Sequence, residues 1–265
     1  MPSSVSSSTD SPLALELLKV KKSFGRQVVC QEVNLAVRKG KVLSVLGPSG
    51  CGKTVTLKML IGLELPDAGS IIFSGMDLAQ FQHEDDFLPI RRRISMVFQG
   101  AALFDSMDVY ENVSYPLRVQ GIKSERDIAD RVHQTLSLVG LPDAAHKMPG
   151  ELSGGMKKRI GLARAIITNP EIILYDEPTA GLDPINTRRI VDLILMLKER
   201  LLCTSIVIAH DMEVVRLVSD DVAFFFAGRV RQTGSYQELR DSLDPMVRGF
   251  VRGDPSILLT MQESL

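Results

Sequence analysis

Residues 47–54 read Gly47-Pro48-Ser49-Gly50-Cys51-Gly52-Lys53-Thr54 and fit the pattern G-x-x-x-x-G-K-[ST]. The apolar run Val42 to Leu46 precedes them, and Thr54 to Leu63 follows with apolar residues at helical spacing. A strand, a glycine-rich loop and a helix in this order allow successive backbone N–H groups to surround phosphate oxygens at a helix N-terminus. We therefore expect this loop to bind a nucleotide, with Lys53 on its β- and γ-phosphates and the Thr54 hydroxyl on Mg²⁺.

Cys51, within this loop, is either a small spacer or a redox-sensitive thiol. Because a reactive thiol requires a lowered pKa, which a sequence cannot supply, we interpret Cys51 as a spacer. The three cysteines of the chain, Cys30, Cys51 and Cys203, are widely spaced and odd in number. Such usage favours free thiols in a reducing, intracellular compartment over a disulfide framework.

Two carboxylates follow a second apolar run. Ile172 to Tyr175 precede Asp176 and Glu177, and Pro178 prevents the strand from continuing. Alone, such a pair is more often a solvated turn, but downstream of a phosphate-binding loop it is typical of a Walker B strand. We expect Asp176 to hold Mg²⁺ through water and Glu177 to polarise the attacking water as general base, a role worth about 10² to 10⁴-fold in rate.

The segment Leu152-Ser153-Gly154-Gly155-Met156 opens a further amphipathic helix. Serine is a favoured N-cap residue, and a helix N-terminus attracts anions through its free N–H groups and its dipole. The segment therefore predicts a second phosphate-binding helix end on the same chain.

The remaining pattern alternates strands with helices. Residues 13–37 indicate a strand-rich opening, and residues from about 100 to 150 are largely helical. We expect breaks in the helical region at Pro116, Gly121, Gly140 and Pro142. Further strands are expected at Ser70 to Phe73, Ile172 to Tyr175 and Thr204 to Ala209, and a helix between the last two has apolar positions Ile190, Val191, Ile194 and Leu197. This order predicts an α/β fold with a mostly parallel sheet and ligands at the carboxyl ends of its strands.

Composition describes an ordinary globular chain. Its 265 residues suffice for one large α/β domain or at most two small ones, and 45% of them are apolar and 24% charged. A formal net charge of −1 argues against nucleic acid as a partner. No stretch reaches the roughly 18 apolar residues that cross a bilayer, so membrane association requires a partner. The Ser-rich start lacks the features of a secretion signal and is interpreted as a short disordered tail.

Taken together, these motifs resemble those of the ABC-transporter ATPase family. The resemblance covers about Leu13 to Gly234, and its five elements occur in the family's order: the phosphate-binding loop, the Ser153 segment, the Walker B strand, Asp183 in Ala180-Gly181-Leu182-Asp183, and His210 after a strand. It implies a P-loop NTPase fold of ABC type, with a mostly parallel sheet core, an N-terminal antiparallel β segment and an inserted helical subdomain. The implied divisions are a tail at 1–12, a nucleotide-binding domain at 13–242 with its helical subdomain at about 100–160, and a C-terminal extension at 243–265.

The resemblance also implies roles for single residues. Phe24, in Ser23-Phe24-Gly25, would stack on adenine, although a lone aromatic residue is usually part of a core. Gln99 would sense Mg²⁺ and the attacking water and report to a membrane partner, and His210 would contact the γ-phosphate and position Glu177. The other histidines, His83, His133 and His146, are expected at the surface.

In this family the ATP sites are shared between two subunits. Ser153, Gly154 and Gly155 of one subunit, together with Asp183, would complete the ATP site of the other, so a head-to-tail dimer with ATP and Mg²⁺ is implied. Met156 departs from the commonest form of the family, in which glutamine is frequent here. The polar contact of that glutamine with the nucleotide is therefore not carried over.

Three segments narrow the resemblance to the Mce-associated, Mla-type subgroup, which moves phospholipids or related lipids. They are Gln99 to Leu117, Leu152 to Ala165 and Asp244 to Phe250. The implied partners are integral membrane permease subunits and a lipid-binding Mce-type protein in the same complex. The implied location is the cytoplasmic face of the inner membrane, where the chain would be held peripherally through its permease.

Other functions remain open at this point. A soluble ABC ATPase of DNA repair or translation lacks support because there is no tandem ATPase domain, no zinc-spaced cysteine set and no basic arm. A P-loop kinase for a small metabolite leaves the Ser153 segment unexplained. A non-catalytic scaffold does not account for the set Lys53, Thr54, Asp176 and Glu177. An ABC importer for a small polar solute stays an alternative to lipid transport.

The segment after Gln99 is unusually apolar for a connection. The residues that make it so are Ala101, Ala102, Leu103, Phe104 and Met107. Such a cluster is either local core or a docking groove. The resemblance favours docking, because in this family a short permease helix lies beside the loop that carries Gln99.

Overall fold

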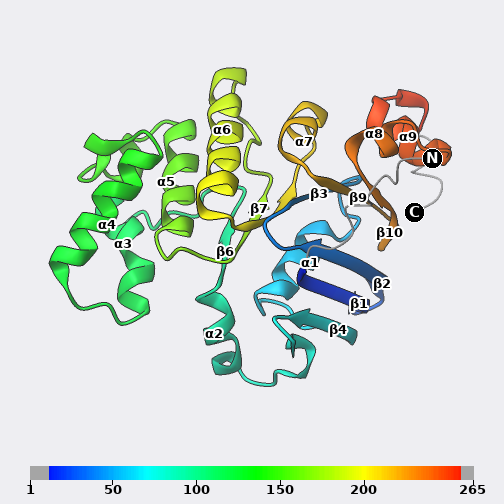
Figure 1. Cartoon of the computed structure of the whole chain (residues 1–265), viewed down its shortest axis with the longest axis horizontal. Coiled ribbons are helices and arrows are strands. Elements are labelled where there is room, and N and C mark those ends of the chain that lie inside the picture. The colour runs from blue at the N-terminus through cyan, green and yellow to red at the C-terminus, as the bar shows by residue number, and fades with distance from the viewer. Residues whose placement is uncertain (1–11, 258–265) are drawn as a thin grey trace, which may run out of the picture.

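Two β-sheets and the helices packed around them make up the computed structural model, which describes residues 12–257 (Figure 1). The larger sheet has six strands in the order β10-β9-β3-β8-β7-β6. Its strands are β3 (Val42–Leu46), β6 (Ile94–Val97), β7 (Ile172–Asp176), β8 (Thr204–Ile208), β9 (Asp221–Phe226) and β10 (Arg229–Gly234). All of them run parallel except β10, which pairs antiparallel with β9. The expectation of a mostly parallel sheet is confirmed.

The smaller sheet is antiparallel and has the strand order β2-β1-β4-β5. It is formed by β1 (Leu13–Phe24), β2 (Gln27–Arg38), β4 (Ala68–Phe73) and β5 (Met76–Asp77). β1 and β2 form a long hairpin in which Phe24 pairs with Gln27 beside the turn. This sheet is the N-terminal antiparallel segment expected from the sequence.

The helices cover both faces of the larger sheet and extend from one end of it (Figure 1). They are α1 (Lys53–Leu60), α2 (Leu88–Arg91), α3 (Val109–Val119), α4 (Glu125–Leu138), α5 (Gly154–Ile166), α6 (Pro184–Leu201), α7 (Met212–Val218), α8 (Tyr236–Arg240) and α9 (Pro245–Arg252). Short 3₁₀ turns lie at Leu78–Gln80, Glu84–Phe87, Pro142–Ala144 and Pro149–Glu151. α3, α4 and α5 form the helical part at one end, and α8 and α9 lie at the other.

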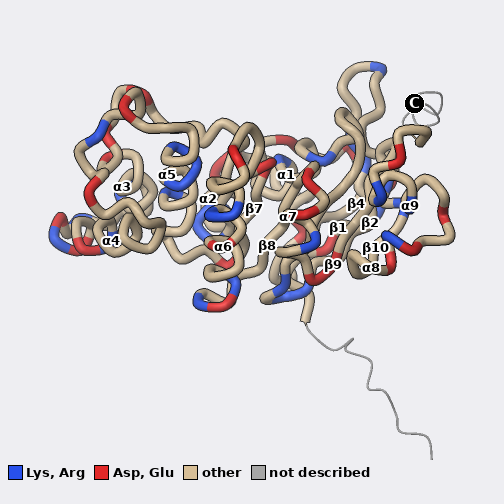
Figure 2. Tube along the Cα trace, turned by 90° about the horizontal axis from the view of Figure 1, so that it is seen from above, with Lys and Arg blue, Asp and Glu red and all other residues tan. Residues whose placement is uncertain are grey.

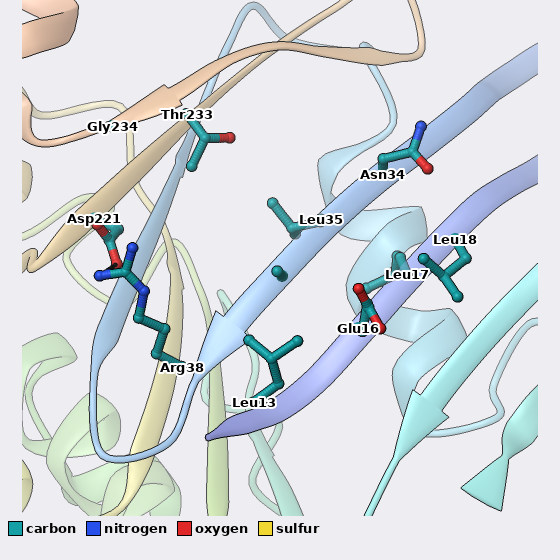
Figure 3. A pocket seen from close by; sticks show the side chains of 11 residues that line it. Leu13, Glu16, Leu17, Leu18, Asn34, Leu35, Arg38, Asp221, Thr233 and Gly234 are labelled. Atoms are coloured by element: carbon teal, nitrogen blue, oxygen red, sulfur yellow. Dashed lines mark ion pairs between the residues drawn. The ribbon is translucent and has the colours of Figure 1, made fainter. Parts of the chain in front are cut away.

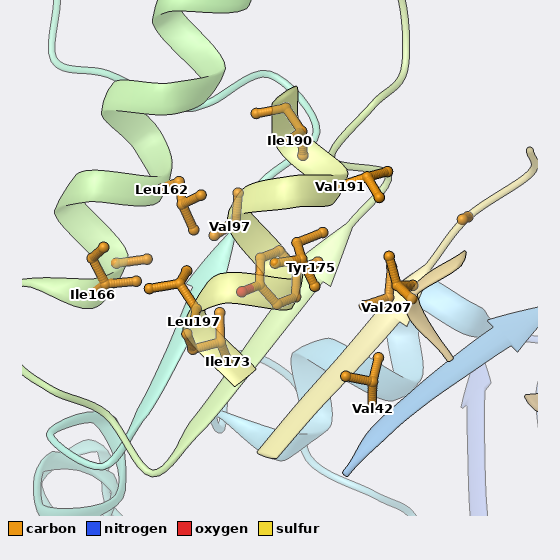
Figure 4. Packing of buried hydrophobic residues seen from close by; sticks show 14 of the residues in the cluster. Val42, Val97, Leu162, Ile166, Ile173, Tyr175, Ile190, Val191, Leu197 and Val207 are labelled. Carbon is orange, nitrogen blue, oxygen red and sulfur yellow. The ribbon is translucent and has the colours of Figure 1, made fainter. Parts of the chain in front are cut away.

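Successive residues of the central strands face two separate apolar cores. In β7, Ile173 and Tyr175 belong to the core beneath α5, α6 and α7, whereas Ile172 and Leu174 belong to the core shared with α1 and the antiparallel sheet. Figure 4 shows Tyr175 in the first core near Leu197 of α6. Burial of each such side chain contributes about 1.5 to 3 kcal/mol, so both faces hold the strand ends in place.

The structure corrects one sequence expectation. Pro116 does not break the helical region but lies inside α3. A proline removes a single N–H from the helical ladder, and here the loss falls near the C-terminal end of the helix. The helix continues because Gln120 N donates to Pro116 O at 3.0 Å.

Helix α9 is folded onto the rest of the domain. Val247 and Val251 of α9 are buried, and the Phe250 ring lies 5.1 Å from the ring of Phe224 in β9. The proposed boundary at residue 243 separates this helix in sequence, and it stays a prediction. The tail expected at residues 1–12 lies outside the described residues except for Pro12, and the end of the extension, 258–265, lies outside them too.

Lys and Arg are interspersed with Asp and Glu along residues 12–257 (Figure 2). Within residues 12–257, no helix is both long enough and apolar enough to pass through a bilayer. His83, His133 and His146 are exposed, as expected.

Candidate active site

The phosphate-binding loop connects the end of β3 to α1, as the sequence indicates. Gly47 and Gly52 have φ angles of 149° and 103°. A Cβ on Gly47 would lie 2.2 Å from the Phe225 carbonyl oxygen, and one on Gly52 would lie 2.8 Å from the Val29 carbonyl oxygen. Larger residues would therefore push the loop away from β9 and β2, because the loop lies directly against their backbones.

Lys53 is the cation at the centre of the loop. Its residue is only 6% exposed, and its ammonium donates to the carbonyl oxygens of Gly47 and Pro48 at 2.8 Å each. Gly52 caps α1 without a side-chain hydrogen bond, and the first turn of the helix contains no acidic residue. A buried cation beside open helix N–H groups fits phosphate oxygens.

Thr54 and Asp176 bring together the ligands expected for Mg²⁺. Thr54 Oγ1 donates to Asp176 Oδ1 at 3.1 Å, so the start of α1 meets the end of β7. Burial raises the pKa of the Asp176 carboxyl, and this effect exceeds the opposing hydrogen bond from Thr54 and the charges of Lys53 and Lys58. A carboxylate that is short of compensating positive charge, next to a hydroxyl, fits a hard divalent cation.

The residues that follow three neighbouring parallel strands meet at Glu177. Gln99 Nε2, after β6, donates to Glu177 Oε2 at 3.0 Å, and His210 Nε2, after β8, lies 2.7 Å from Glu177 Oε1. Because β6, β7 and β8 are neighbours in the sheet, their carboxyl ends meet at one edge. The two neighbours contact both oxygens of the carboxylate and so fix its orientation, while its role as general base stays a prediction.

The Ser153 segment forms the expected helix end. Ser153 Oγ accepts a hydrogen bond from Met156 N at 3.3 Å and caps α5. Asp183 caps α6 through the N–H groups of Ile185 and Asn186, and the Asn186 side chain lies under Gly155. The two caps are thus neighbours. Within residues 12–257, no hydrogen bond joins the Ser153 segment to loop 47–54.

Phe24 lies beside the turn of the β1–β2 hairpin and is 44% exposed. Its ring has the Lys22 ammonium 5.0 Å from its centroid. The same hairpin reaches the phosphate-binding loop, because Val29 and Cys30 of β2 lie against Gly52. Phe24 is therefore an exposed ring rather than a core residue, and stacking on adenine stays a prediction.

The thiols are buried and free. Cys30, Cys51 and Cys203 form no disulfide, and burial raises the pKa of all three. For Cys51, burial outweighs the Lys53 ammonium 3.8 Å away. A raised pKa disfavours the reactive thiolate, which agrees with Cys51 as a spacer.

Three residues that hold the segments near this edge of the sheet were not predicted from the sequence. Lys158 and Arg164 of α5 donate to backbone carbonyls after β6. Asn112 of α3 is fully buried, and its amide bonds the backbone of Phe104 at both N and O. The basic run after Met156 and an amide inside an otherwise apolar helix face were the available signals.

A groove of about 680 Å³ lies beside the segment that follows Gln99. Phe104 and Tyr115 line it with their rings 5.0 Å apart, and Arg92 and Arg164 line it as well. Leu103 instead packs against the core beneath α5, α6 and α7. The cluster expected after Gln99 is therefore divided between core and groove.

A smaller hollow of about 380 Å³ lies between the antiparallel sheet and the β9–β10 edge (Figure 3). Leucine side chains of β1 and β2 line much of it, including Leu13, Leu17 and Leu35. Arg38, which also lines it, points toward Asp221, and the two form an ion pair at 3.7 Å. This hollow lies apart from the groups gathered around Glu177.

The phosphate-binding loop, the Thr54–Asp176 pair and the fixed Glu177 carboxylate define a P-loop ATPase. The family model described as "ABC transporter" matches residues 30–180. The chain belongs to the ABC transporter family, as the subunit that hydrolyses ATP to drive transport.

Three relatives show how broad the similarity is. The chain is 40% identical over 241 residues to the probable ribonucleotide transport ATP-binding protein Mkl of Mycobacterium tuberculosis, covering 91% of this chain and 67% of that protein. It is 40% identical over 230 residues to the intermembrane phospholipid transport system ATP-binding protein MlaF of Haemophilus influenzae, covering 87% of each. It is 42% identical over 221 residues to the methionine import ATP-binding protein MetN of Rhizobium johnstonii, covering 83% of this chain and 60% of that one.

A solved ATP-binding cassette has the same fold. It is a dimeric post-hydrolysis state bound to ADP and Pi, and it matches with a TM-score of 0.77 and 30% identity over 83% of this chain and 98% of its own. Cassettes of this family form dimers and pair with permeases.

Proposed function

We propose that this chain is the Mg²⁺-dependent ATPase subunit that powers a separate permease for phospholipids or related lipids. The main support is that the Glu177 carboxylate is fixed between Gln99 and His210. Gln99 also begins the segment that leads into the apolar groove, so the site of hydrolysis and the groove are connected. Hydrolysis and a docking surface thus share one short stretch of backbone.

Each catalytic group has a defined task in this proposal. Lys53 releases the carbonyls of Gly47 and Pro48 and binds phosphate oxygens, and Thr54 and Asp176 hold Mg²⁺. When bound, the metal neutralises charge on the phosphates. Glu177 accepts the proton of the attacking water, while Gln99 and His210 keep its carboxylate aimed at that water.

The ATP sites are proposed to be shared in a head-to-tail dimer. Ser153 and its two glycines form a helix end with free N–H groups, and no hydrogen bond in residues 12–257 brings them to their own phosphate-binding loop. A second copy of the chain would place this helix end on the nucleotide of the first. Asp183 would lie beside it, because Asn186 connects the two caps.

The groove is proposed to receive a cytoplasmic helix of the permease. It is lined by apolar side chains and by Arg91, Arg92 and Arg164, and within the described residues no Asp or Glu lines it. Arg91 is paired with Glu84, whereas Arg92 makes no ion pair among residues 12–257. The fitting partner is therefore a helix with an apolar face and at least one acidic side chain. Docking there would hold the chain at the cytoplasmic face of the inner membrane.

Lipid as the cargo is supported by similarity rather than by contact chemistry. The MlaF relative matches over most of both chains, and three segments, 99–117, 152–165 and 244–250, resemble the Mla-type subgroup. A lipid-binding Mce-type protein is the further partner that this assignment implies. MetN is similarly close in identity, so import of a small polar solute is the competing function.

The test is purification of the full chain with its membrane partners in mild detergent, followed by identification of subunits and bound lipids by mass spectrometry. We expect a permease and a lipid-binding protein carrying phospholipid, and ATPase activity of the complex that rises with added phospholipid. Phe104→Glu is the comparison variant, because a charge in the groove should release both the permease and the lipid-binding protein. A complex with a solute-binding protein and no lipid response would favour import of a polar solute.

A further inference from the structure

One face of α5 lies along the backbone of residues 99–102. Lys158, Gly161 and Arg164 follow one another at intervals of one helical turn, and each contacts this segment. The Lys158 ammonium donates to the Gln99 carbonyl at 2.5 Å, and the Arg164 guanidinium donates to the Ala101 carbonyl at 2.9 Å. Between them, a Cβ on Gly161 would lie 3.1 Å from the Ala101 Cβ.

Lys158 also reaches the backbone of Glu177. Its ammonium donates to the Glu177 carbonyl at 3.3 Å, so one side chain from α5 connects the ends of β6 and β7. The residue is 8% exposed. Burial lowers its pKa, while the negative charges of Glu177 and Asp176 oppose that effect. A buried cation with two carbonyl partners has little freedom to move. It belongs to the basic run Lys157-Lys158-Arg159, and Figure 2 shows basic residues on α5.

The Glu177 backbone is one that needs such support. Its φ angle is 49°, a left-handed conformation that costs a non-glycine residue free energy unless neighbouring groups hold it. The Glu177 N–H donates to the Ile208 carbonyl at 3.0 Å, and the Glu177 carbonyl accepts from Ala180 N at 3.2 Å and from the Lys158 ammonium at 3.3 Å. Both backbone groups of the residue are thereby held, the N–H by β8 and the carbonyl by the following turn together with α5.

We propose that Lys158 is a positioning residue for ATP hydrolysis. It holds Gln99 and Glu177 in the mutual arrangement in which the Gln99 amide reaches the Glu177 carboxylate. This inference rests on the proposed role of Glu177 as general base. Because Lys158 lies one turn after the Ser153 helix end, movement of α5 relative to the sheet displaces the carbonyl contacts of the base directly.

The test compares Lys158→Met, Lys158→Arg and the neighbouring Lys157→Met in the full chain. Met preserves the length and apolar stem of lysine but removes its charge and its donors. We expect Lys158→Met to lower kcat by about 10 to 100-fold with KM for ATP changed less than about threefold, because misplacement of a catalytic group affects the chemical step. Arg should restore most of kcat. Lys157→Met, at a side chain without a hydrogen bond among residues 12–257, should behave like the unchanged chain.

A double variant separates positioning from a general structural role. If Lys158 acts through Gln99, Gln99→Ala combined with Lys158→Met should lose less than the product of the two single losses. Multiplicative losses, an equal fall in kcat and nucleotide affinity, or unfolding of both Lys158→Met and Lys158→Arg would overturn the proposal. Glu177→Gln in the same assay tests the base independently. If it hydrolyses ATP normally, the base assignment fails, and if it is inactive while Lys158→Met is fully active, only Lys158 fails.

Discussion

His210 Nε2 lies 2.7 Å from Glu177 Oε1, although the two residues are 33 positions apart in the chain. They meet because β7 and β8 are adjacent parallel strands that end at the same edge of the sheet. Gln99, which follows β6 on the other side, takes the second carboxylate oxygen at 3.0 Å. The Glu177 carboxylate therefore has one side-chain neighbour on each of its oxygens.

Glu177→Gln is expected to keep ATP binding while hydrolysis falls by about 10² to 10⁴-fold, because an amide cannot accept the proton of water. The variant should accumulate as an ATP-bound dimer, measurable by size-exclusion chromatography with multi-angle light scattering. His210→Ala should have a smaller effect on kcat, since it removes only the orientation of the carboxylate. Normal turnover by Glu177→Gln would refute its role as base.

Lys53→Ala is expected to act at the preceding step. Lys53 is the buried ammonium of the phosphate-binding loop, so its loss should weaken ATP binding by at least about 100-fold, as expected for a charge-assisted contact in a buried site. Isothermal titration with ATP and Mg²⁺ measures the affinity directly. Lys123→Ala is the matched control, because Lys123 is exposed and lies between α3 and α4, outside the loop. Unchanged affinity in Lys53→Ala would contradict the phosphate role.

The sequence predicted the sheet and its ligand-binding edge because the deciding signals are local. Val42 to Leu46, the glycine-rich loop and the following helix are contiguous, and each has a pattern that a short segment specifies alone. The expected break at Pro116 was wrong because the tendency of proline to end helices reflects only the average cost of one lost hydrogen bond. It does not say that burial on one face of α3 outweighs a single loss near its end.

The contacts around Glu177 were only partly predictable. Gln99 and His210 follow strands and fit a family pattern, but Lys158 and Arg164 act on backbone carbonyls that become neighbours only after α5 packs on the segment after β6. A side chain that donates to a backbone carbonyl has no particular residue type as its partner, so the sequence does not reveal the contact. Likewise, residue type alone could not decide that Phe104 lines the groove whereas Leu103 packs against the core.

Asp176→Asn is expected to stabilise the nucleotide-free chain while abolishing Mg²⁺-dependent hydrolysis. Burial raises the pKa of Asp176 in the folded state. As pH rises through the unfolded-state value toward the raised folded value, the unfolded chain ionises first and the free energy of unfolding falls. Asn avoids this loss, so Tm at pH 7 should rise by about 2 °C or more and the gain should shrink toward about pH 4.

Asp183→Asn is the control for the direction of the Tm change, because the pKa of Asp183 is shifted the opposite way. Hydrogen bonds from Asn186 lower the pKa of Asp183, so its contribution to stability is present above the unfolded-state pKa and is lost as pH falls through the folded value. The two variants should therefore shift Tm at pH 7 in opposite directions in differential scanning calorimetry. A lower Tm for Asp176→Asn without nucleotide would contradict the proposed charge imbalance.

Mixed subunits test whether the ATP sites are shared. A Lys53→Ala subunit paired with a Ser153→Arg subunit places both lesions in one composite site and leaves the other site intact. We expect each variant alone to be inactive and the mixture to recover part of the activity. If the mixture stays inactive, cysteine crosslinking of position 153 to the opposite loop 47–54 decides between separate sites and sites that must act together. Absence of such a crosslink in the ATP-trapped Glu177→Gln dimer would contradict sharing.

The final prediction concerns the permease groove, and it depends on which side of the backbone each residue after Gln99 occupies. Phe104 is 41% exposed, its ring packs on Tyr115, and it lies under the Arg164 guanidinium at 5.6 Å. Leu103 contacts the core beneath α5, α6 and α7 instead. Phe104→Glu should therefore fold normally, bind ATP and lose the permease, whereas Leu103→Glu should lower Tm through burial of an unpaired charge.

Charge reversal at the groove distinguishes docking from simple loss of apolar area. Arg92→Glu adds an acidic side chain to a groove whose lining residues within 12–257 include no carboxylate, so it should repel an acidic permease helix and weaken co-purification. Leu243→Glu is the matched surface control, because Leu243 is 96% exposed and lies between α8 and α9, at the opposite end from α3 (Figure 1). It should retain the permease and lipid-stimulated ATPase activity. If Phe104→Glu and Arg92→Glu fold and still co-purify with a permease as the control does, the docking assignment is wrong, and the groove has another occupant.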